Sequence, residues 1–301
     1  MPEIRRCVGN VCVFALCLCG GTAQAASEPQ IFLDGLETPP TLVVYYVSGE
    51  GAHGICRGRR VDGSWQRGEP VLLDGVFDGD AVDPDVLREQ DGSFRLYYFR
   101  GHFVTPPPPL PEPSRFYSAH SSDGLNFSID GEVFALDNST DPSVVRLPDG
   151  RRLLAVAQNN AGALAVRFAI SSGDGPFTLL ASRIDGAGIP ELAVLADGSL
   201  RLCYNAPGGI ASRRSFDAGS SWQPEAGLRL AVAEPIADPS LVRRAEGGWW
   251  MFYKAFNGSG TPGPAGHKVN LALALDGDTF LPSSAVFDFA SVPDGALLPA
   301  P

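Results

Sequence analysis

Residues 83–99 read Asp-Pro-Asp-Val-Leu-Arg-Glu-Gln-Asp-Gly-Ser-Phe-Arg-Leu-Tyr-Tyr-Phe, and this stretch decides the fold. An apolar segment that starts at Asp-Pro runs into an Asp-Gly pair and then into a second, aromatic segment. Asp-Gly between two such segments is typical of a tight β-hairpin turn. The stretch therefore predicts two antiparallel strands. With small variations, the pattern recurs in three further places: residues 141–156, 189–204 and 238–253.

A second signature follows the hairpins, an alternating strand that ends in a polar turn closed by an aromatic residue. It occurs five times, at residues 62–65, 122–127, 174–177, 215–222 and 276–280. Successive copies lie 43–61 residues apart, which suits one four-stranded blade with its loops. Amphipathic segments of helical period are absent outside the N-terminal segment. The sequence therefore predicts an all-β fold, a five-bladed β-propeller of four-stranded antiparallel blades, with a β-sandwich as the alternative.

The first blade lacks an obvious inner strand. Two segments could supply it, residues 28–33 near the start of the domain or residues 292–297 near its end. If the second segment supplies it, the ring closes by pairing the two ends of the domain. The sequence leaves both possibilities open.

The N-terminus has the features of a secretory signal peptide. Two arginines precede an apolar stretch at residues 8–19, and Ala23-Gln24-Ala25 provides the small residues of a cleavage site. We expect residues 1–25 to be a signal peptide and residues 26–301 to form a single propeller domain, exported to the periplasm or secreted. No membrane span is expected after cleavage. An uncleaved anchor is the alternative.

Charge and composition exclude several classes of partner. The formal net charge is −11 and the isoelectric point about 4.8, which disfavours nucleic acid and anionic membranes but not neutral carbohydrate. The four histidines are scattered without ligand spacing, so we predict no cofactor and no metal site. Calcium held by rim carboxylates is the one metal site left open. Outside the predicted signal peptide only Cys56 and Cys203 occur, and we expect both to be unpaired and buried.

The Asp-Pro motifs place acidic residues at the starts of the inner strands. Because the strands of a blade alternate in direction, the inner strands start at the rim that also carries the long loops, and they converge on the propeller axis. We expect four carboxylates to meet there: Asp83, Asp141, Glu191 and Asp238. Glycoside hydrolysis needs one protonated and one ionised carboxyl group, and like charges held close together separate their pKa values in this way. Beside Asp238, further candidates for binding sugar hydroxyls lie near the same rim: Arg100, His102, Asn159, Asn205, Lys254 and His267.

At these residues the chain resembles the five-bladed glycosidases of families 43 and 32, which place an Asp, a second Asp and a Glu on the inner strands of three blades. The resemblance implies a hydrolase acting on poly- or oligosaccharide, such as a furanoside or xyloside. Asp83 would be the base or nucleophile, Asp141 would tune the pKa and orient the sugar, and Glu191 would be the acid. In those families the acid Glu precedes Gly-Pro or Cys-Pro, whereas Glu191 follows Pro190.

Two other functions fit the same sequence. Asp can cap the entry to a strand and Pro can fix its first residue, which predicts a non-catalytic propeller that binds glycan or protein on this rim. Residues 215–222 resemble the Asp-box of sialidases, which suggests a sialidase-like exo-glycosidase. The five-blade count and the lack of a recognisable arginine triad argue against it. We expect the polar turns to be structural, with the acid bonded to local backbone and the aromatic residue between blades.

Overall fold

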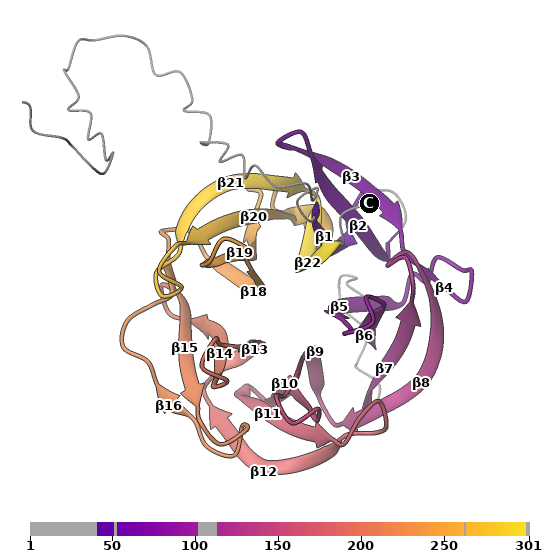
Figure 1. Cartoon of the computed structure of the whole chain (residues 1–301). Coiled ribbons are helices and arrows are strands. Elements are labelled where there is room, and N and C mark those ends of the chain that lie inside the picture. The colour runs from indigo at the N-terminus through magenta and orange to yellow at the C-terminus, as the bar shows by residue number, and fades with distance from the viewer. Residues whose placement is uncertain (1–40, 51–52, 102–112, 262, 299–301) are drawn as a thin grey trace, which may run out of the picture. The chain divides into compact units, whose positions relative to one another are not determined.

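The structure, a computed structural model, describes residues 41–50, 53–101, 113–261 and 263–298. These residues form five β-sheets around one central axis (Figure 1). The predicted all-β, five-bladed propeller is confirmed. The predicted signal peptide, the candidate strand at residues 28–33 and His102 lie outside the described residues. Within the described part of the chain, no helix has the length and apolarity needed to cross a membrane.

The blades are numbered in chain order, and the strands of each are given from the axis outwards. Blade 1 consists of β22 (Ala290–Leu298), β1 (Thr41–Ser48), β2 (Ile55–Val61) and β3 (Ser64–Pro70). Blade 2 consists of β5 (Ala81–Arg88), β6 (Phe94–Arg100), β7 (Ser114–Ser121) and β8 (Asn126–Leu136). Blade 3 consists of β9 (Ser139–Arg146), β10 (Arg152–Asn160), β11 (Ala163–Ser171) and β12 (Thr178–Asp185).

Blade 4 consists of β13 (Gly188–Val194), β14 (Leu200–Ala206) and β15 (Gly209–Ser215), and its outer position is shared by the short strands β16 (Gln223–Pro224) and β17 (Leu230–Ala231). Blade 5 consists of β18 (Ile236–Arg243), β19 (Trp249–Phe256), β20 (His267–Ala274) and β21 (Leu281–Asp288). A short strand between blades 1 and 2, β4 (Leu72–Leu73), pairs in parallel with β8. One 3₁₀ turn, η1 (Gly263–Gly266), precedes β20.

The C-terminal strand closes the ring. β22 pairs antiparallel with β1, with Val43 opposite Ala296 and Thr41 opposite Leu298. Of the two segments that could supply the inner strand of blade 1, the structure therefore selects the C-terminal one. Val44 and Phe252 belong to one buried apolar cluster, so blades 1 and 5 share a core across the closure.

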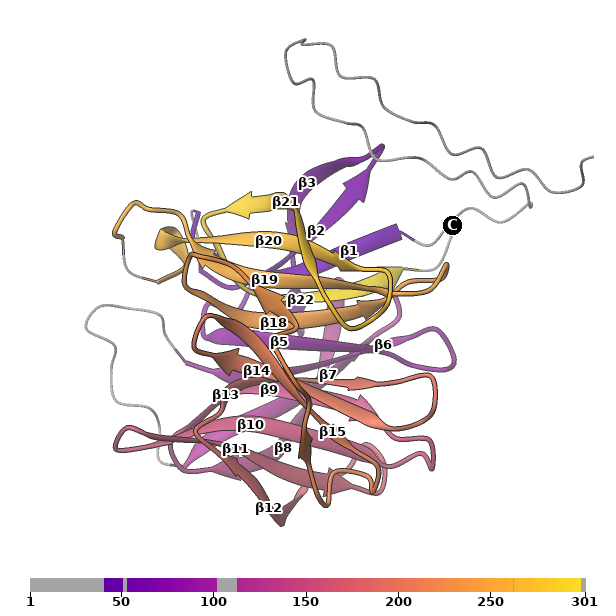
Figure 2. The ribbon, with the colours of Figure 1, turned by 90° about the vertical axis from the view of Figure 1, so that its left-hand side faces the viewer.

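Strands run between two rims of the propeller (Figure 2). The inner strands start at one rim, where β6 also ends at Arg100 and β19 at Phe256. The tight hairpins and the polar turns lie at the opposite rim, because consecutive strands in each blade are antiparallel. This is the arrangement predicted from the sequence.

The polar turns hold the blades to one another. Trp222, which closes the turn of blade 4, stacks on Phe168 of blade 3 with ring centroids 5.0 Å apart. Trp65 of blade 1 meets Phe252 of blade 5 edge-on at 5.5 Å. In the turn of blade 2, Asp123 Oδ1 accepts hydrogen bonds from two backbone N–H groups, both at 2.8 Å. These contacts match the prediction that the turns are structural.

Every inner strand is bulged at the residue before its proline. The backbone φ of this residue lies between 47° and 54° in all five strands: Asp83, Asp141, Ile189, Asp238 and Val292. Positive φ is tolerated by Asp but is rare for β-branched residues such as Ile and Val. A bulge redirects the side chain of the extra residue. Because it occurs with three different residue types, the bulge belongs to the fold and does not depend on the side chain present.

Candidate functional site

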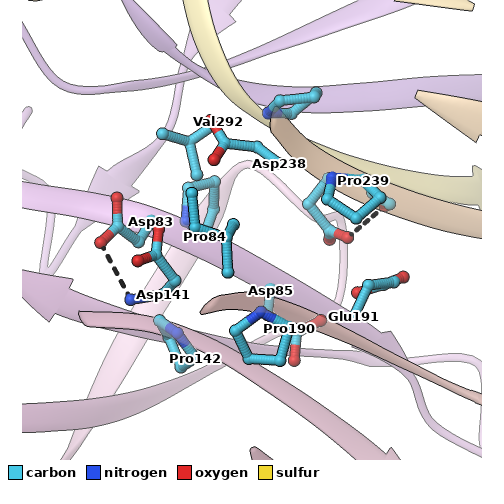
Figure 3. Close-up of a pocket in the computed structure, with 14 residues that line it drawn as sticks. Asp83, Pro84, Asp85, Asp141, Pro142, Pro190, Glu191, Asp238, Pro239 and Val292 are labelled. Atoms are coloured by element: carbon cyan, nitrogen blue, oxygen red, sulfur yellow. Dashed lines mark hydrogen bonds between the residues drawn. The ribbon is translucent and has the colours of Figure 1, made fainter. Parts of the chain in front are cut away.

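The five bulged residues surround the start of the central channel, and we call them the mouth ring: Asp83, Asp141, Ile189, Asp238 and Val292. Figure 3 shows Asp83, Asp141 and Asp238 gathered around this opening with Val292 beside them. The cavity at the axis has a volume of about 30 Å³, which has room for only a few water molecules. A ligand larger than a few water molecules would therefore lie over the mouth and not inside the channel.

Asp83 and Asp141, in neighbouring blades, are in direct contact. The backbone N–H of Asp141 donates to Oδ2 of Asp83 at 3.3 Å, and Thr140 Oγ1 donates to Oδ2 of Asp141 at 2.6 Å. Asp83 is only 3% exposed, and its Oδ1 has no hydrogen-bond partner among the described residues. Asp141 is partly exposed at the mouth. One carboxyl oxygen of this pair is thus buried without a partner, which is costly unless the group is protonated.

Lys254 provides the positive charge of the mouth. Its Nζ lies 2.5 Å from Oδ2 of Asp238, and both side chains are largely buried. Burial opposes the charge of Lys254, but the attraction of Asp238, with Asp141 and Asp83 behind it, outweighs burial and raises the pKa of Lys254. Three carboxyl groups thus share one buried ammonium group.

The two neighbouring carboxyl groups do not titrate together. Burial, strengthened by the charge of Asp238, raises the pKa of Asp141 to about 6. Burial, followed by repulsion from Asp141 and Asp238, raises the pKa of Asp83 well above its ordinary range. Burial therefore favours the protonated form of both carboxyl groups, and it does so more strongly for Asp83 than for Asp141. A pair of carboxyl groups with separated pKa values is what acid and base chemistry requires.

A second ring lies two residues further along the inner strands, and we call it the latch ring: Asp85, Ser143, Glu191, Ser240 and Asp294. The side chain of each member accepts a hydrogen bond from a backbone N–H of the next blade. Val144 donates to Asp85 Oδ2, Leu192 to Ser143 Oγ at 2.9 Å, Leu241 to Glu191 Oε1 at 2.7 Å, Gly295 to Ser240 Oγ at 2.9 Å, and Val86 to Asp294 Oδ2 at 2.6 Å. The five bonds form a closed circle that includes the closing strand β22.

Glu191 belongs to the latch ring, and Ile189 has the mouth position of blade 4. Glu191 is 7% exposed, and its Oε2 also accepts a hydrogen bond from Ser143 Oγ at 3.0 Å. Both carboxyl oxygens are thus bonded within the fold. Aligning the five inner strands on their prolines puts Glu191 beside Asp85 and not beside Asp83, and this signal is present in the sequence. The other four members of the latch ring were not predicted as site residues.

Comparison with known proteins identifies the fold. The sequence matches no protein-family profile and no curated protein. Among solved structures, an endo-1,4-beta-xylanase from Bacteroides thetaiotaomicron is similar with a TM-score of 0.58 and 16% identity, over 83% of this chain and 92% of that chain. The fold is that of propeller glycosidases.

Two further solved structures have a similar fold. A thermostable family-43 glycoside hydrolase is similar with a TM-score of 0.51 and 15% identity, over 67% of this chain and 72% of that one. The Hadza microbial sialidase Hz136 has a TM-score of 0.52 and 17% identity, over 80% of this chain and 54% of that one. The resemblance to propeller glycosidases is confirmed at the level of fold, which is all that identities of this size establish.

The remaining predicted site residues lie around the glycosidase-type propeller at different distances from its axis. Arg100 ends β6, where its Nη2 lies 2.9 Å from Asp78 Oδ2. Asn159 ends β10, and its Oδ1 accepts a hydrogen bond from Gly162 N at 2.8 Å, within the turn to β11. Both residues are on the mouth rim but are engaged in local contacts.

Asn205 of β14 and His267 of β20 each contact a neighbouring blade. Asn205 Nδ2 donates to Ile236 O at 3.5 Å, and its Oδ1 is buried without a partner among the described residues. His267 Nδ1 is 2.9 Å from Ser291 Oγ of blade 1. Burial and the charge of Lys254 lower the pKa of His267 to about 4, so its ring is neutral at physiological pH.

Within the described ranges, no three or more His, Cys, Asp or Glu side chains are arranged to hold a metal ion. The two cysteines are both free, Cys203 fully buried and Cys56 partly exposed. Burial raises the pKa of Cys56 to about 11 and that of Cys203 to about 12, so both are thiols at neutral pH. The expectation of a buried side chain was wrong for Cys56, which packs against the apolar cluster of blades 1 and 5 but stays partly exposed.

Proposed function

We propose that this protein is an exported glycosidase that hydrolyses glycosidic bonds of poly- or oligosaccharides at the mouth ring. The observation that carries the proposal is the pair Asp83 and Asp141, two adjacent carboxyl groups with separated pKa values at the opening of a glycosidase-type propeller. Carbohydrate-cleaving enzymes among the similar folds support it.

The fold alone does not explain the three aspartates of the mouth ring. Ile189 and Val292 adopt the same positive φ, so the bulge does not require an acid. Asn tolerates this conformation about as well as Asp and would avoid the cost of burying an ionisable group. A reaction that uses one protonated and one ionised carboxyl group would explain why buried aspartates are present in spite of the free energy that their burial costs.

In the proposed reaction Asp83 is the acid. It donates its proton to the glycosidic oxygen as the bond from that oxygen to the anomeric carbon breaks. The ionised Asp141 either takes a proton from the attacking water or itself attacks the anomeric carbon, forming an ester that water then hydrolyses. The family resemblance implies the base role for Asp83, but the larger upward shift of its pKa supports the opposite assignment.

The other charged groups have supporting roles in the proposal. Lys254, paired with Asp238, favours the ionised form of Asp141. Lys254 also binds sugar hydroxyls, and the other candidates for this binding role are Arg100, His102, Asn159, Asn205 and His267. Glu191, which the resemblance implies as the acid, has both oxygens bonded in the latch ring. We therefore give it a structural role and test it separately.

The test is an assay of the chain on a panel of aryl glycosides and neutral oligosaccharides derived from xylan and arabinan. Asp83→Asn and Asp141→Asn should each lower kcat by about 10²- to 10⁴-fold without changing the melting temperature by more than a few degrees. Asp149→Asn, in an exposed hairpin of the opposite rim, is the matched control and should leave kcat unchanged.

Glu191→Gln separates the two assignments of the acid. The amide keeps an acceptor oxygen for Leu241 N, so our proposal expects a loss of stability with activity retained. A folded Glu191→Gln protein without activity would make Glu191 the acid. Activity that survives both aspartate changes would refute the glycosidase proposal, and glycan binding without turnover would support the non-catalytic propeller.

Export is proposed on the N-terminal residues alone. Expression of the full-length sequence in a bacterial host should yield a protein outside the cytoplasm whose first residue is Ala26. Retention of residues 1–25 on a membrane-bound product would instead support an anchor.

A further inference from the structure

An exposed aromatic side chain lies next to the mouth ring. Phe256 is the last residue of β19, at the rim where the inner strands start, and it is 55% exposed. Residues of one strand that are two apart point to the same face, so Phe256 shares a face with Lys254. Since Lys254 reaches Asp238 in the mouth ring, Phe256 is the next side chain outwards, about 7 Å further along the strand.

The ring of Phe256 is held in one orientation by His267. The two residues are directly opposite in the pairing of β19 with β20. Their rings meet edge to face, with centroids 5.2 Å apart and planes at 73°. His267 is itself held by the contact of its Nδ1 with Ser291 Oγ across the seam between blades 5 and 1. A fixed, exposed aromatic face loses little conformational entropy when it binds a ligand.

His267 also offers a polar group at this position. Its Nε2 has no hydrogen-bond partner among the described residues. Because the imidazole is neutral above pH 5, Nε2 is either a donor or an acceptor, depending on which nitrogen carries the proton. A sugar hydroxyl can complement both forms.

We propose that Phe256 and His267 form a subsite that binds one sugar unit beyond the two groups that flank the cleaved bond. The apolar C–H face of the sugar would cover the Phe256 ring, and one hydroxyl would hydrogen-bond to His267 Nε2. This inference rests on the proposed function and extends it to the substrate, which would be a chain of neutral sugars. A uronate or sialate would meet three aspartates and one lysine at the mouth and would be repelled.

The test compares Phe256→Ala with Phe216→Ala in the full-length chain. Phe216 is 65% exposed on the opposite rim, so its removal controls for the loss of an exposed aromatic residue. Binding of xylohexaose and arabinohexaose is measured by calorimetry on proteins that also carry Asp141→Asn, which prevents cleavage. The kcat and KM on aryl glycosides and on the hexasaccharides are measured on proteins with Asp141 intact. Phe256→Tyr is the conservative variant.

Phe256→Ala should weaken binding of the hexasaccharide by about tenfold and raise its KM similarly, with kcat on a short aryl glycoside changed less than twofold. Phe256→Tyr should restore binding, and Phe216→Ala should behave as the parent. Equal binding by Phe256→Ala and its parent would overturn the subsite while leaving the glycosidase proposal intact. If the hexasaccharides bind in a way that depends on Phe256 but the parent does not cleave them, the glycosidase proposal is refuted and the subsite is retained. If neither hexasaccharide is bound or cleaved, both the glycosidase proposal and the subsite are refuted.

Discussion

The latch ring should make stability depend on pH through Asp294. This residue lies on the closing strand β22, where Oδ2 accepts from Val86 N and Oδ1 from Ser240 Oγ. Burial raises the pKa of Asp294 to about 7. Burial, and then repulsion from Asp294, also raises the pKa of Asp85 and of Glu191. The ring thus contains three buried acids that favour the protonated form.

The direction in which stability changes with pH follows from the number of protons that the folded and unfolded states bind. In the unfolded chain Asp294 releases its proton near pH 4, whereas in the folded chain it keeps the proton until about pH 7. Between these values the folded state binds more protons, so the contribution of Asp294 to stability is complete below pH 4 and is lost as pH rises towards 7. At about 1.4 kcal/mol per pH unit, the loss between pH 5 and 7 is about 2–3 kcal/mol.

Asp294→Asn removes this titration. The amide can accept through only one atom, so one hydrogen bond of the ring is lost at every pH, at a cost of about 1 kcal/mol. Relative to the parent, the variant should therefore gain about 2–3 kcal/mol between pH 5 and 7. For a domain of this size that is a relative rise in Tm of about 5–10 °C.

The assay is thermal unfolding of both proteins at pH 5, 6 and 7, followed by circular dichroism. His267 acts in the opposite direction, because its lowered pKa makes the folded state more stable as pH rises from about 4 to 6.5. The difference between the two proteins removes the contribution of His267, which is common to both, and leaves that of Asp294 together with the repulsion it exerts on Asp85 and Glu191. Asp149→Asn is the control, because Asp149 is fully exposed and its pKa is lowered. A difference in Tm that is the same at pH 5 and 7 would refute the assignment of a held proton to Asp294.

Three further predictions follow from the charged groups. Activity should fall below pH 6 as Asp141 is protonated and fall again at higher pH as Asp83 ionises. A flat profile of kcat/KM against pH would contradict the acid and base roles. Lys254→Met should move the acidic limb of that profile to higher pH by about 1 unit, because it removes the attraction that favours ionised Asp141. An acidic limb at the same pH in both proteins would mean that Lys254 has no influence on the pKa of Asp141. Arg201 is buried, binds both oxygens of Glu225 at 2.7 and 2.8 Å and donates to Gly277 O of blade 5 at 2.6 Å. Arg201→Met should therefore lower the free energy of unfolding, measured by chemical denaturation, by about 3–5 kcal/mol. A loss below 1 kcal/mol would exclude a role of Arg201 in joining blades 4 and 5.

Local sequence patterns were sufficient to predict most of the fold. A strand, an Asp-Gly turn and a following strand are encoded within about twenty residues, and their repetition predicts both the number of blades and the common rim for Asp83, Asp141 and Asp238. Antiparallel connectivity then predicts which ends of the strands share a rim, and this prediction needs no contact between distant residues.

Other features depended on contacts between residues far apart in the chain. Two segments had similar patterns for the inner strand of blade 1, and only the pairing of β22 with β1, some 250 residues away in sequence, distinguishes them. The closed circle of the latch ring also depends on such contacts, because each of its hydrogen bonds joins two blades, as from Leu241 N in blade 5 to Glu191 Oε1 in blade 4.

The repeat, the polar turns and the acids that converge on one opening could be predicted from the amino-acid sequence, because each follows from neighbours along the chain. The folded ring was needed to show that burial favours the protonated form of Asp83 more than that of Asp141, that Lys254 pairs with Asp238, and that Phe256 is exposed at the mouth rim. Protonation and pairing depend on burial and on distances between different blades, and such distances exist only once the ring has closed.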